Sequence, residues 1–248
     1  MENPIAQPAS SGLVNRAKAI VLSPKTEWPI VAAETTEPTK VLTGYAIPLI
    51  AIGPIAALIG SQLFPLTVLG ITLQPSITVA LVSAVVSFAV AILGLYVVAF
   101  VANFLSPKFG GKDGFPAAFR LVAYSMTAYW VAGIFGLLPA LALLSLVGLY
   151  SLYLFYLGAT PVLGVPEDKA VGYTVVTVLV AIVVNLVVMA VAAAITAPLI
   201  ASQVAAATAS AETATVDMGE LGKVEINGDT ATLTVDGQEV QVTVPAEE

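Results

Sequence analysis

Long stretches of the chain contain no charged residue and are rich in aliphatic side chains. A helix needs about 20 apolar residues to cross the roughly 30 Å hydrocarbon core of a bilayer, and a charge at its centre costs about 2.5–3.5 kcal/mol. Five stretches meet this requirement, with Arg120 at the entrance of the third as their sole charge. They run from about Val41 to Phe64, Ile77 to Leu105, Ala118 to Leu137, Pro139 to Leu157 and Val171 to Ile195. The sequence predicts an all-α integral membrane protein with five transmembrane helices.

Composition excludes an ordinary soluble domain. The 248 residues are 58% hydrophobic and 10% charged, whereas soluble domains carry about 25% charged residues. One soluble core could not cover so much apolar surface, but lipid can solvate the outer faces of helices. Two spans have local signals. Pro48 and Pro54 predict a bent first span, and the "GLLPAL" stretch predicts a tight turn between adjacent, antiparallel third and fourth spans.

Basic residues predict the orientation in the membrane. Cytoplasmic loops are enriched in Lys and Arg, and the loops after the first and third spans have neither. The tail from Ala201 onward has a net charge of −8. We therefore expect a cytoplasmic N-terminus and an extracytoplasmic C-terminus. The basic residues behind this expectation are Arg16, Lys18, Lys25, Lys40, Lys108, Lys112, Arg120 and Lys169.

Residues 1–40 are predicted to form a cytoplasmic segment with an interfacial amphipathic helix. In "GLVNRAKAIVL" the apolar residues fall on one helical face, with Arg16 and Lys18 off it, a pattern suited to lying on an anionic leaflet. Trp28 follows as an interfacial aromatic residue. The alternative is a helix that packs on loops of its own chain. Candidate interfacial anchors are Arg16, Lys18, Trp28, Lys108, Lys112 and Arg120.

The stretch "SPKFGGKDGF" carries three charges and three glycines between two apolar spans. A phosphate-binding loop would need G-x-x-x-x-G-K-[ST] after a strand. Here Gly111 and Lys112 are followed by Asp113, and Ser106 stands in place of the first glycine. The favoured interpretation is a flexible cytoplasmic turn with basic anchors, and the alternative is a contact site for lipid headgroups or a partner.

The composition changes after the last span. Residues 198–212 are small and alanine-rich, which predicts a linker or a frayed helix, and residues 213–248 are predicted to form an extracytoplasmic β tail. "GKVEINGDTATLTVDGQEVQVTV" alternates with a period of two, and Asn227-Gly228 and Asp236-Gly237 are typical hairpin turns. We expect a small three-stranded β meander whose apolar face needs a cover.

Three segments in order resemble bacterial members of the Yip1 family. They are "NRAKAIVLSPKTEWPIVAAE", "SPKFGGKDGFPAAFRLVAYSMTAYWVAGIFGLLPAL" and "LYSLYLFYLGATPVLGVPEDKAVGYTVVTV". The resemblance covers about Leu13 to Val188 and implies a five-span Yip1-like domain at residues 41–197 in the inner (plasma) membrane. Eukaryotic relatives act in vesicle traffic and associate with Rab GTPases, but their Asp-Leu-Tyr-Gly-Pro motif does not occur here, so GTPase binding is not carried over.

The sequence points away from catalysis. It has no Cys and no His, and the spans offer no carboxylate pair, so we expect no catalytic residue, no metal site, no cofactor and no nucleic-acid partner. Polar residues in the spans are instead expected to hydrogen-bond between helices. The candidate functional or packing residues are Asn103, Tyr124, Tyr129 and Asn185.

Three functions fit these features. The first is a non-enzymatic membrane-organising or adaptor protein that meets the lipid bilayer and a protein partner or a second copy of itself. The second is a transporter or channel for a small neutral solute, suggested by the prolines of the first span and the few polar groups. The third is an extracytoplasmic sensor built on the β tail.

Overall fold

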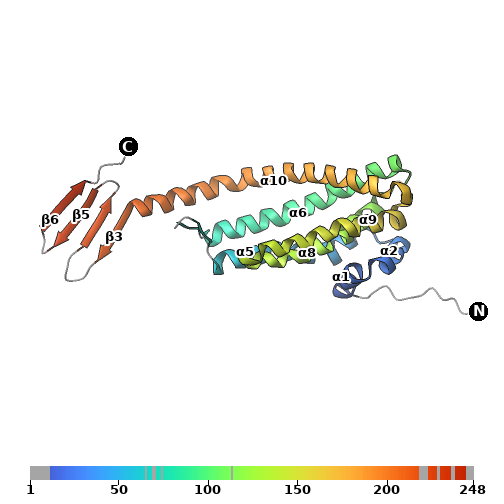
Figure 1. Cartoon of the computed structure of the whole chain (residues 1–248), viewed down its shortest axis with the longest axis horizontal. Coiled ribbons are helices and arrows are strands. Elements are labelled where there is room, and N and C mark those ends of the chain that lie inside the picture. The colour runs from blue at the N-terminus through green and yellow to red at the C-terminus, as the bar shows by residue number, and fades with distance from the viewer. Residues whose placement is uncertain are drawn as a thin grey trace, which may run out of the picture. The chain divides into compact units, whose positions relative to one another are not determined.

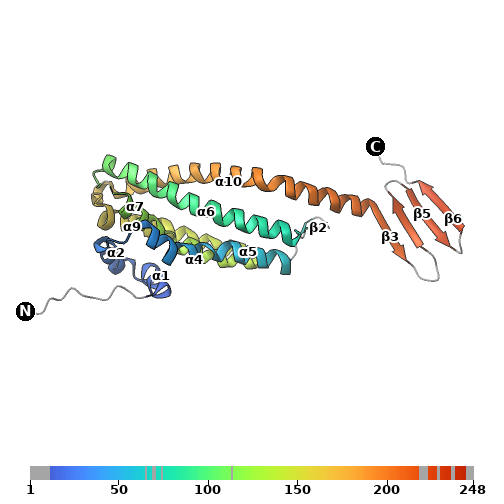
Figure 2. The ribbon, with the colours of Figure 1, turned by 180° about the vertical axis from the view of Figure 1, so that it is seen from behind.

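The computed structural model describes residues 12–64, 66–68, 71–73, 75–112, 114–217, 223–227, 230–235 and 238–243. The chain divides into two compact units, Met1–Ala194 and Ile195–Glu248. The first is a helical bundle (Figures 1 and 2). Four of its helices are long and apolar enough to cross a membrane: Pro38–Leu63, Ile77–Phe109, Pro139–Leu163 and Glu167–Pro198.

The first of these helices is irregular around its prolines, as predicted. It comprises α3 (Pro38–Val41), the π-helical η1 (Leu42–Ala46), α4 (Ile47–Ile50) and α5 (Ile52–Leu63). Because Pro48 has no backbone N–H, the ladder loses a bond, and just before it Ile47 N–H reaches back to the Leu42 carbonyl. A second break at Ala51 lies one turn before Pro54.

The other three long helices lie close to the predicted spans. Helix α6 (Ile77–Leu105) has the predicted bounds and is followed by the 3-10 turn η2 (Ser106–Phe109). The third combines the 3-10 helix η4 (Pro139–Leu149) with α9 (Tyr150–Leu163). The fourth is the apolar part of α10 (Glu167–Glu212). A short hairpin, β1 (Leu66–Val68) with β2 (Ile71–Leu73), connects α5 to α6 and was not predicted.

The predicted third span is not one continuous helix. It is divided into α7 (Phe115–Ser125), α8 (Thr127–Ala132) and the 3-10 helix η3 (Gly133–Leu137). The hydroxyls on either side of the break donate to backbone carbonyls, Ser125 to Leu121 (2.6 Å) and Thr127 to Tyr124 (2.5 Å), and such bonds compete with the helical ladder. The Tyr129 N–H leaves the ladder and donates to Ser151 Oγ at 2.9 Å.

The predicted turn between the third and fourth segments is confirmed. Leu138 is extended between η3 and η4, and η4 packs back along η3 and α8. Gly148 lies so close to Tyr129 that a Cβ would stand 3.2 Å from the Tyr129 Cα atom. The main-chain approach therefore depends on glycine at that position.

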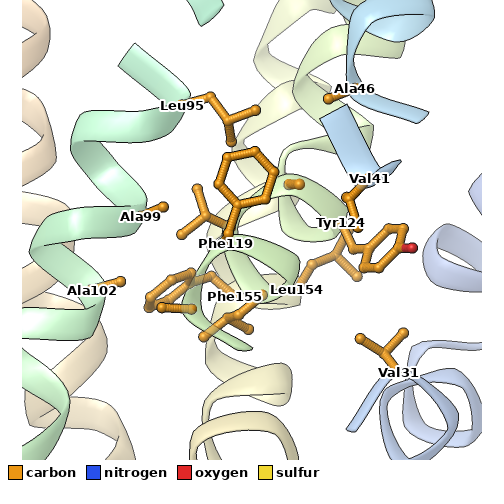
Figure 3. Close-up of a cluster of buried hydrophobic side chains, with 14 of the residues drawn as sticks. Val31, Val41, Ala46, Leu95, Ala99, Ala102, Phe119, Tyr124, Leu154 and Phe155 are labelled. Atoms are coloured by element: carbon orange, nitrogen blue, oxygen red, sulfur yellow. The ribbon is translucent and has the colours of Figure 1, made fainter. Parts of the chain in front are cut away.

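The core lies where α7 is surrounded by the other helices (Figure 3). Residues Ala118–Ser125 of α7 are all buried. Leu95 and Ala99 of α6, Leu154 and Phe155 of α9, and Val31 from the N-terminal region converge on Phe119 and Tyr124. Small residues on α6 let the large rings of α7 and α9 fit between the helices.

The N-terminal helices α1 (Leu13–Leu22) and α2 (Pro24–Ala33) pack on one end of the bundle (Figures 1 and 2), where α2 contacts α9 and α1 contacts α7 and α8. The apolar face of α1 packs against the core cluster: Ile20 is fully buried, and Leu13, Ala17 and Val21 are partly buried. The prediction that this face lies on lipid is therefore wrong, because the protein itself covers it. The alternative weighed from the sequence, packing on its own chain, is the one observed.

The second unit contains the end of α10 and a sheet. Residues 198–212, expected as a linker or a frayed helix, continue α10 as far as Glu212. Four antiparallel strands follow in the order β3 (Thr213–Asp217), β4 (Lys223–Asn227), β5 (Thr230–Val235) and β6 (Gln238–Thr243). Three had been expected. The second residue of each predicted hairpin turn, Gly228 and Gly237, lies outside the described residues.

Candidate functional site

Arg16 is buried and has two acidic partners. Its guanidinium contacts Glu27 Oε1 at 2.5 Å and pairs with Glu34. Arg16 comes from α1, Glu27 from α2, and Glu34 is the residue that ends α2, so the pairs join the two helices. Only 7% of Arg16 is exposed. A charge this deep is tolerable because its partners compensate for lost hydration.

Two tyrosines connect Arg16 to the break between α7 and α8. The Arg16 guanidinium carbon lies 5.5 Å from the centre of the Tyr124 ring, within the range of a cation–π contact. Tyr124 meets Tyr45 of the first span edge-on, with ring centres 4.7 Å apart. The Tyr45 hydroxyl lies 2.6 Å from Thr127 Oγ1. We call this continuous set the arginine cluster: Arg16, Glu27, Glu34, Tyr45, Tyr124 and Thr127.

Arg120 makes a second buried attachment beside the arginine cluster. Its Nη1 donates to the Thr36 carbonyl at 3.1 Å, which fastens the segment between α2 and the first span to α7. Its Nε has no hydrogen-bond partner within the part of the chain that the structure describes. Arg120 was predicted as an interfacial anchor, but it is buried and bonds to its own chain.

Trp28 is also buried, at 1% exposure, and so does not meet the interface as predicted. Its ring packs on Gly158 of α9, where a Cβ would stand 2.8 Å from the ring and 2.5 Å from Leu121 Cδ1. A glycine in α9 thus makes the recess that receives Trp28. Helix α2 is attached to α9 through this fit, in addition to the buried charges.

The glycine-rich loop is shaped by the turn that follows α9. The Lys112 N–H donates to the Leu163 carbonyl at 2.7 Å, and Ser106 Oγ donates to the Lys112 carbonyl at 2.8 Å. A Cβ on Gly111 would stand 2.4 Å from Ser106 Oγ. Asn103 accepts from the Gly114 N–H at 2.8 Å. The glycine at position 111 therefore lets the loop pack closely on the turn after α9. Asn103 fixes the loop by its hydrogen bond to Gly114.

The other predicted site residues lie apart from the arginine cluster. Lys18, Lys108 and Lys112 are exposed, as an anchor role requires, and Lys108 Nζ lies 4.1 Å from the centre of the Phe104 ring. Tyr129 is 56% exposed. Asn185 is exposed on α10, where it lines two cavities between α10 and the bundle.

Comparison with known protein families gives one match. The family model for the Yip1 domain matches residues 18–189, more than two thirds of the chain. The chain belongs to the Yip1 domain family. Searches of curated proteins and of solved structures found no match.

The buried charges of this Yip1 protein lie where α1 and α2 pack on the bundle. Within the described residues, no group of three or more His, Cys, Asp or Glu could hold a metal ion. The buried ions Arg16, Glu27 and Arg120 all contact their own chain. What this arrangement can do is fasten the N-terminal helices and exclude water from the helix ends.

Sequence reasoning missed Glu27, Glu34, Tyr45 and Thr127. The available signal was two acids about two helical turns apart, preceded by a single arginine on a mostly apolar helix. That pattern fits both a buried ion cluster and a charged face exposed to solvent, because the first 40 residues contain several other charges. The match to the Yip1 domain begins at residue 18, beyond Arg16.

Replacing Tyr45 with phenylalanine tests the hydrogen bond to Thr127 while keeping the ring contact with Tyr124. Hydrogen bonds between membrane helices average about 0.6 kcal/mol and reach about 1.7 kcal/mol. We expect Tyr45→Phe to lower the melting temperature of the detergent-purified protein by a few degrees. Tyr129→Phe is the matched control, because that tyrosine is largely exposed. Equal melting of both variants and the unmodified protein would rule out a stabilising bond.

Proposed function

We propose that this Yip1 protein is a non-enzymatic adaptor or membrane-organising component of the cell inner membrane. In this proposal the bundle is its membrane anchor, and the packed α1 and α2 helices are a platform presented to the cytoplasm. The observation that carries the proposal is that the buried charges attach the N-terminal segment to the bundle. Arg16 and Arg120 hold the N-terminal segment to the bundle, and apart from Arg120 at the entrance of the third, the five predicted spans contain no Asp, Glu, Lys, Arg or His for proton or ion coupling.

A fifth crossing is part of the proposal. The broken segment from α7 to η3 supports it, because its two ends meet opposite ends of the first span. Arg120 bonds to Thr36, just before that span, while Leu137 lies beside Gly60, near the end of α5. At about 1.5 Å per residue, Phe115–Leu137 is long enough for a hydrocarbon core of roughly 30 Å.

The basic residues support a cytoplasmic N-terminus. The loop with Lys108 and Lys112 packs on the turn before Lys169, since a Cβ on Gly110 would stand 3.4 Å from Pro166 Cγ and 3.8 Å from Lys169 Nζ. This loop and the N-terminal helices occupy the same end of the bundle (Figures 1 and 2). A single basic end is what the positive-inside rule expects of the cytoplasmic side.

The outer face of α1 is the surface that we assign to a partner. Leu22 is 75% exposed and Val14 59% exposed, with Lys18 and Lys25 exposed nearby. Apolar residues rimmed by charges are typical of interaction surfaces. The partner would be a cytoplasmic protein or a second copy of this chain.

Cross-linking in native membranes, followed by capture through a C-terminal tag, tests the proposal. We expect one cross-linked species that Leu22→Glu reduces at least fivefold and Thr35→Glu, an exposed control outside α1, leaves unchanged. Reporters fused to the two ends should appear on opposite sides of the membrane. A monomer without partners, or reporters on the same side, would overturn it. Solute flux in proteoliposomes that disappears in Asn185→Leu would favour the transporter instead, since Asn185 lines the cavities.

A further inference from the structure

Helix α10 is held to the bundle near its beginning. Ala170, Tyr173 and Thr177 are buried. The Tyr173 hydroxyl donates to the Ala102 carbonyl at 2.8 Å, and its ring packs on Phe155 with ring centres 5.7 Å apart. Beyond this attachment, most described side chains of α10 are exposed, including Ile182 and Leu186. Within the first unit, α10 is thus fixed to the bundle at residues 170–177, and most of its described side chains from 178 to 194 are exposed.

Two cavities lie between α10 and the bundle, with volumes of about 250 Å³ and about 420 Å³. Five residues line both, so the cavities are two lobes of one groove: Val98, Val122, Met126, Ala181 and Asn185. Gly94 lies in the larger lobe, and a Cβ there would meet no atom within 4 Å. The groove is therefore open space that larger side chains could have filled.

The smaller lobe collects neutral polar groups. Ser125 of α7, Ser151 at the start of α9, and Thr177 and Asn185 of α10 all line it. Ser125 Oγ donates to the Leu121 carbonyl and Ser151 Oγ accepts from the Tyr129 N–H, so each hydroxyl keeps further hydrogen-bonding capacity. Thr177 is 1% exposed, and its Oγ1 lies beside the Tyr173 hydroxyl. Three helices thus bring hydroxyls and an amide to one place deep among apolar spans.

The larger lobe is also mostly apolar. Its lining includes Val90, Leu95, Val184 and Met189, and Ser87, Tyr129, Trp130 and the shared Asn185 add polar groups. An apolar cavity with a few convergent polar groups is the usual form of a small-molecule site, and such sites measure about 300–1,000 Å³. No charged residue lines either lobe, so an ionised head group would be buried without a counter-charge.

We propose that this groove binds a single-chain neutral amphiphile, whose hydroxyl or carbonyl head bonds to the polar groups around Asn185, which lines both lobes, and whose hydrocarbon tail lies along the apolar lining. Water alone fits less well, because each buried water needs about three polar partners and most of the lining of both lobes is apolar.

Photolabelling of the full-length protein in phospholipid nanodiscs tests the site. The probes are diazirine analogues of hexadecanol, of palmitate and of hexadecane, so they share a tail and differ in the head. We expect the hexadecanol probe to label peptides of α6 and α10 about tenfold more than the hexadecane probe, the ratio that corresponds to about 1.4 kcal/mol. The palmitate probe should label no better than hexadecane at pH 8.

Two variants separate the lobes. Asn185→Leu should abolish the preference for hexadecanol over hexadecane, and Gly94→Phe should reduce labelling by both probes at least fivefold by filling the larger lobe. Val183→Phe is the control, since Val183 is exposed and lines neither lobe. Ala91→Leu gives a smaller obstruction if Gly94→Phe does not fold, as judged by its melting temperature.

Some outcomes would overturn the proposal. Equal labelling by all three probes, spread over the lipid-facing helices and unaffected by the variants, would mean ordinary contact with bulk lipid. Cross-links between copies near Asn185 would assign the groove to an interface. Neither outcome depends on the partner surface of α1, so the amphiphile site and the adaptor function can fail separately.

Discussion

Replacing Arg16 with methionine is expected to lower the free energy of unfolding by about 3–5 kcal/mol, the usual cost of removing one partner from a buried ion pair. The substitution leaves the Glu27 and Glu34 carboxylates without the guanidinium that compensates for their lost hydration. It also removes the contact with the Tyr124 ring. The melting temperature of the detergent-purified protein measures the effect, and protease cleavage between α2 and the first span should accelerate.

Two comparisons make the Arg16 result specific. Lys18→Met removes a charge from the exposed side of the same helix, and we expect it to change the unfolding free energy by less than about 0.5 kcal/mol. Combining Arg16→Met with Glu27→Met and Glu34→Leu should recover most of the loss, because apolar replacement of a whole buried ion cluster is often neutral or stabilising. If Arg16→Met melts like Lys18→Met, the cluster contributes nothing to holding α1.

Replacing Gly60 with alanine is expected to lower the free energy of unfolding by about 1–3 kcal/mol, the usual cost of overpacking a close contact. The new Cβ would stand 2.5 Å from the Leu137 carbonyl oxygen and 2.8 Å from that of Gly136. Both atoms belong to the backbone, so the two segments must separate and lose contacts along their length. Thermal unfolding in detergent, or in lipid nanodiscs, measures the effect.

Gly44→Ala is the matched control for Gly60→Ala. Gly44 lies in the same span, is exposed, and a Cβ there would meet no atom within 4 Å. Helix propensity favours alanine over glycine by about 1 kcal/mol, so the control should be neutral or slightly stabilising. A neutral Gly60→Ala would show that α5 and η3 are not in close contact.

The small residues of the first span illustrate how far sequence reasoning reached. Small residues four apart, Gly53 with Ala57 and Ala56 with Gly60, are a sequence pattern that permits close helix approach. In the structure both glycines make such approaches, Gly53 to Gly133 and Gly60 to Leu137. The spacing could not name the partner segment, because any backbone with a small residue at the contact would fit.

The arginine cluster was less accessible to sequence reasoning. The helical pattern places Arg16 off the apolar face of α1. That position predicts an anchor for lipid headgroups. The same pattern fits an inward arginine when acids from a second helix lie opposite. Whether Arg16 faces lipid or the protein depends on whether the turn at Ser23 brings Glu27 and Glu34 of the second helix opposite it. Tertiary packing decides this.

The sequence by itself determined that the chain is a membrane protein and where four of its long helices run. Lipid is the good solvent for the outer faces of apolar helices that carry no charge over about 20 residues. It also located the irregularity of the first span, since proline removes a backbone donor wherever it stands. Only the tertiary structure showed that the third apolar stretch breaks at Met126 and that Ser151, brought there by a neighbouring segment, accepts the Tyr129 N–H just after the break. The same holds for the inward side of α1 and the groove behind Asn185, since both depend on which surfaces the folded helices bring together.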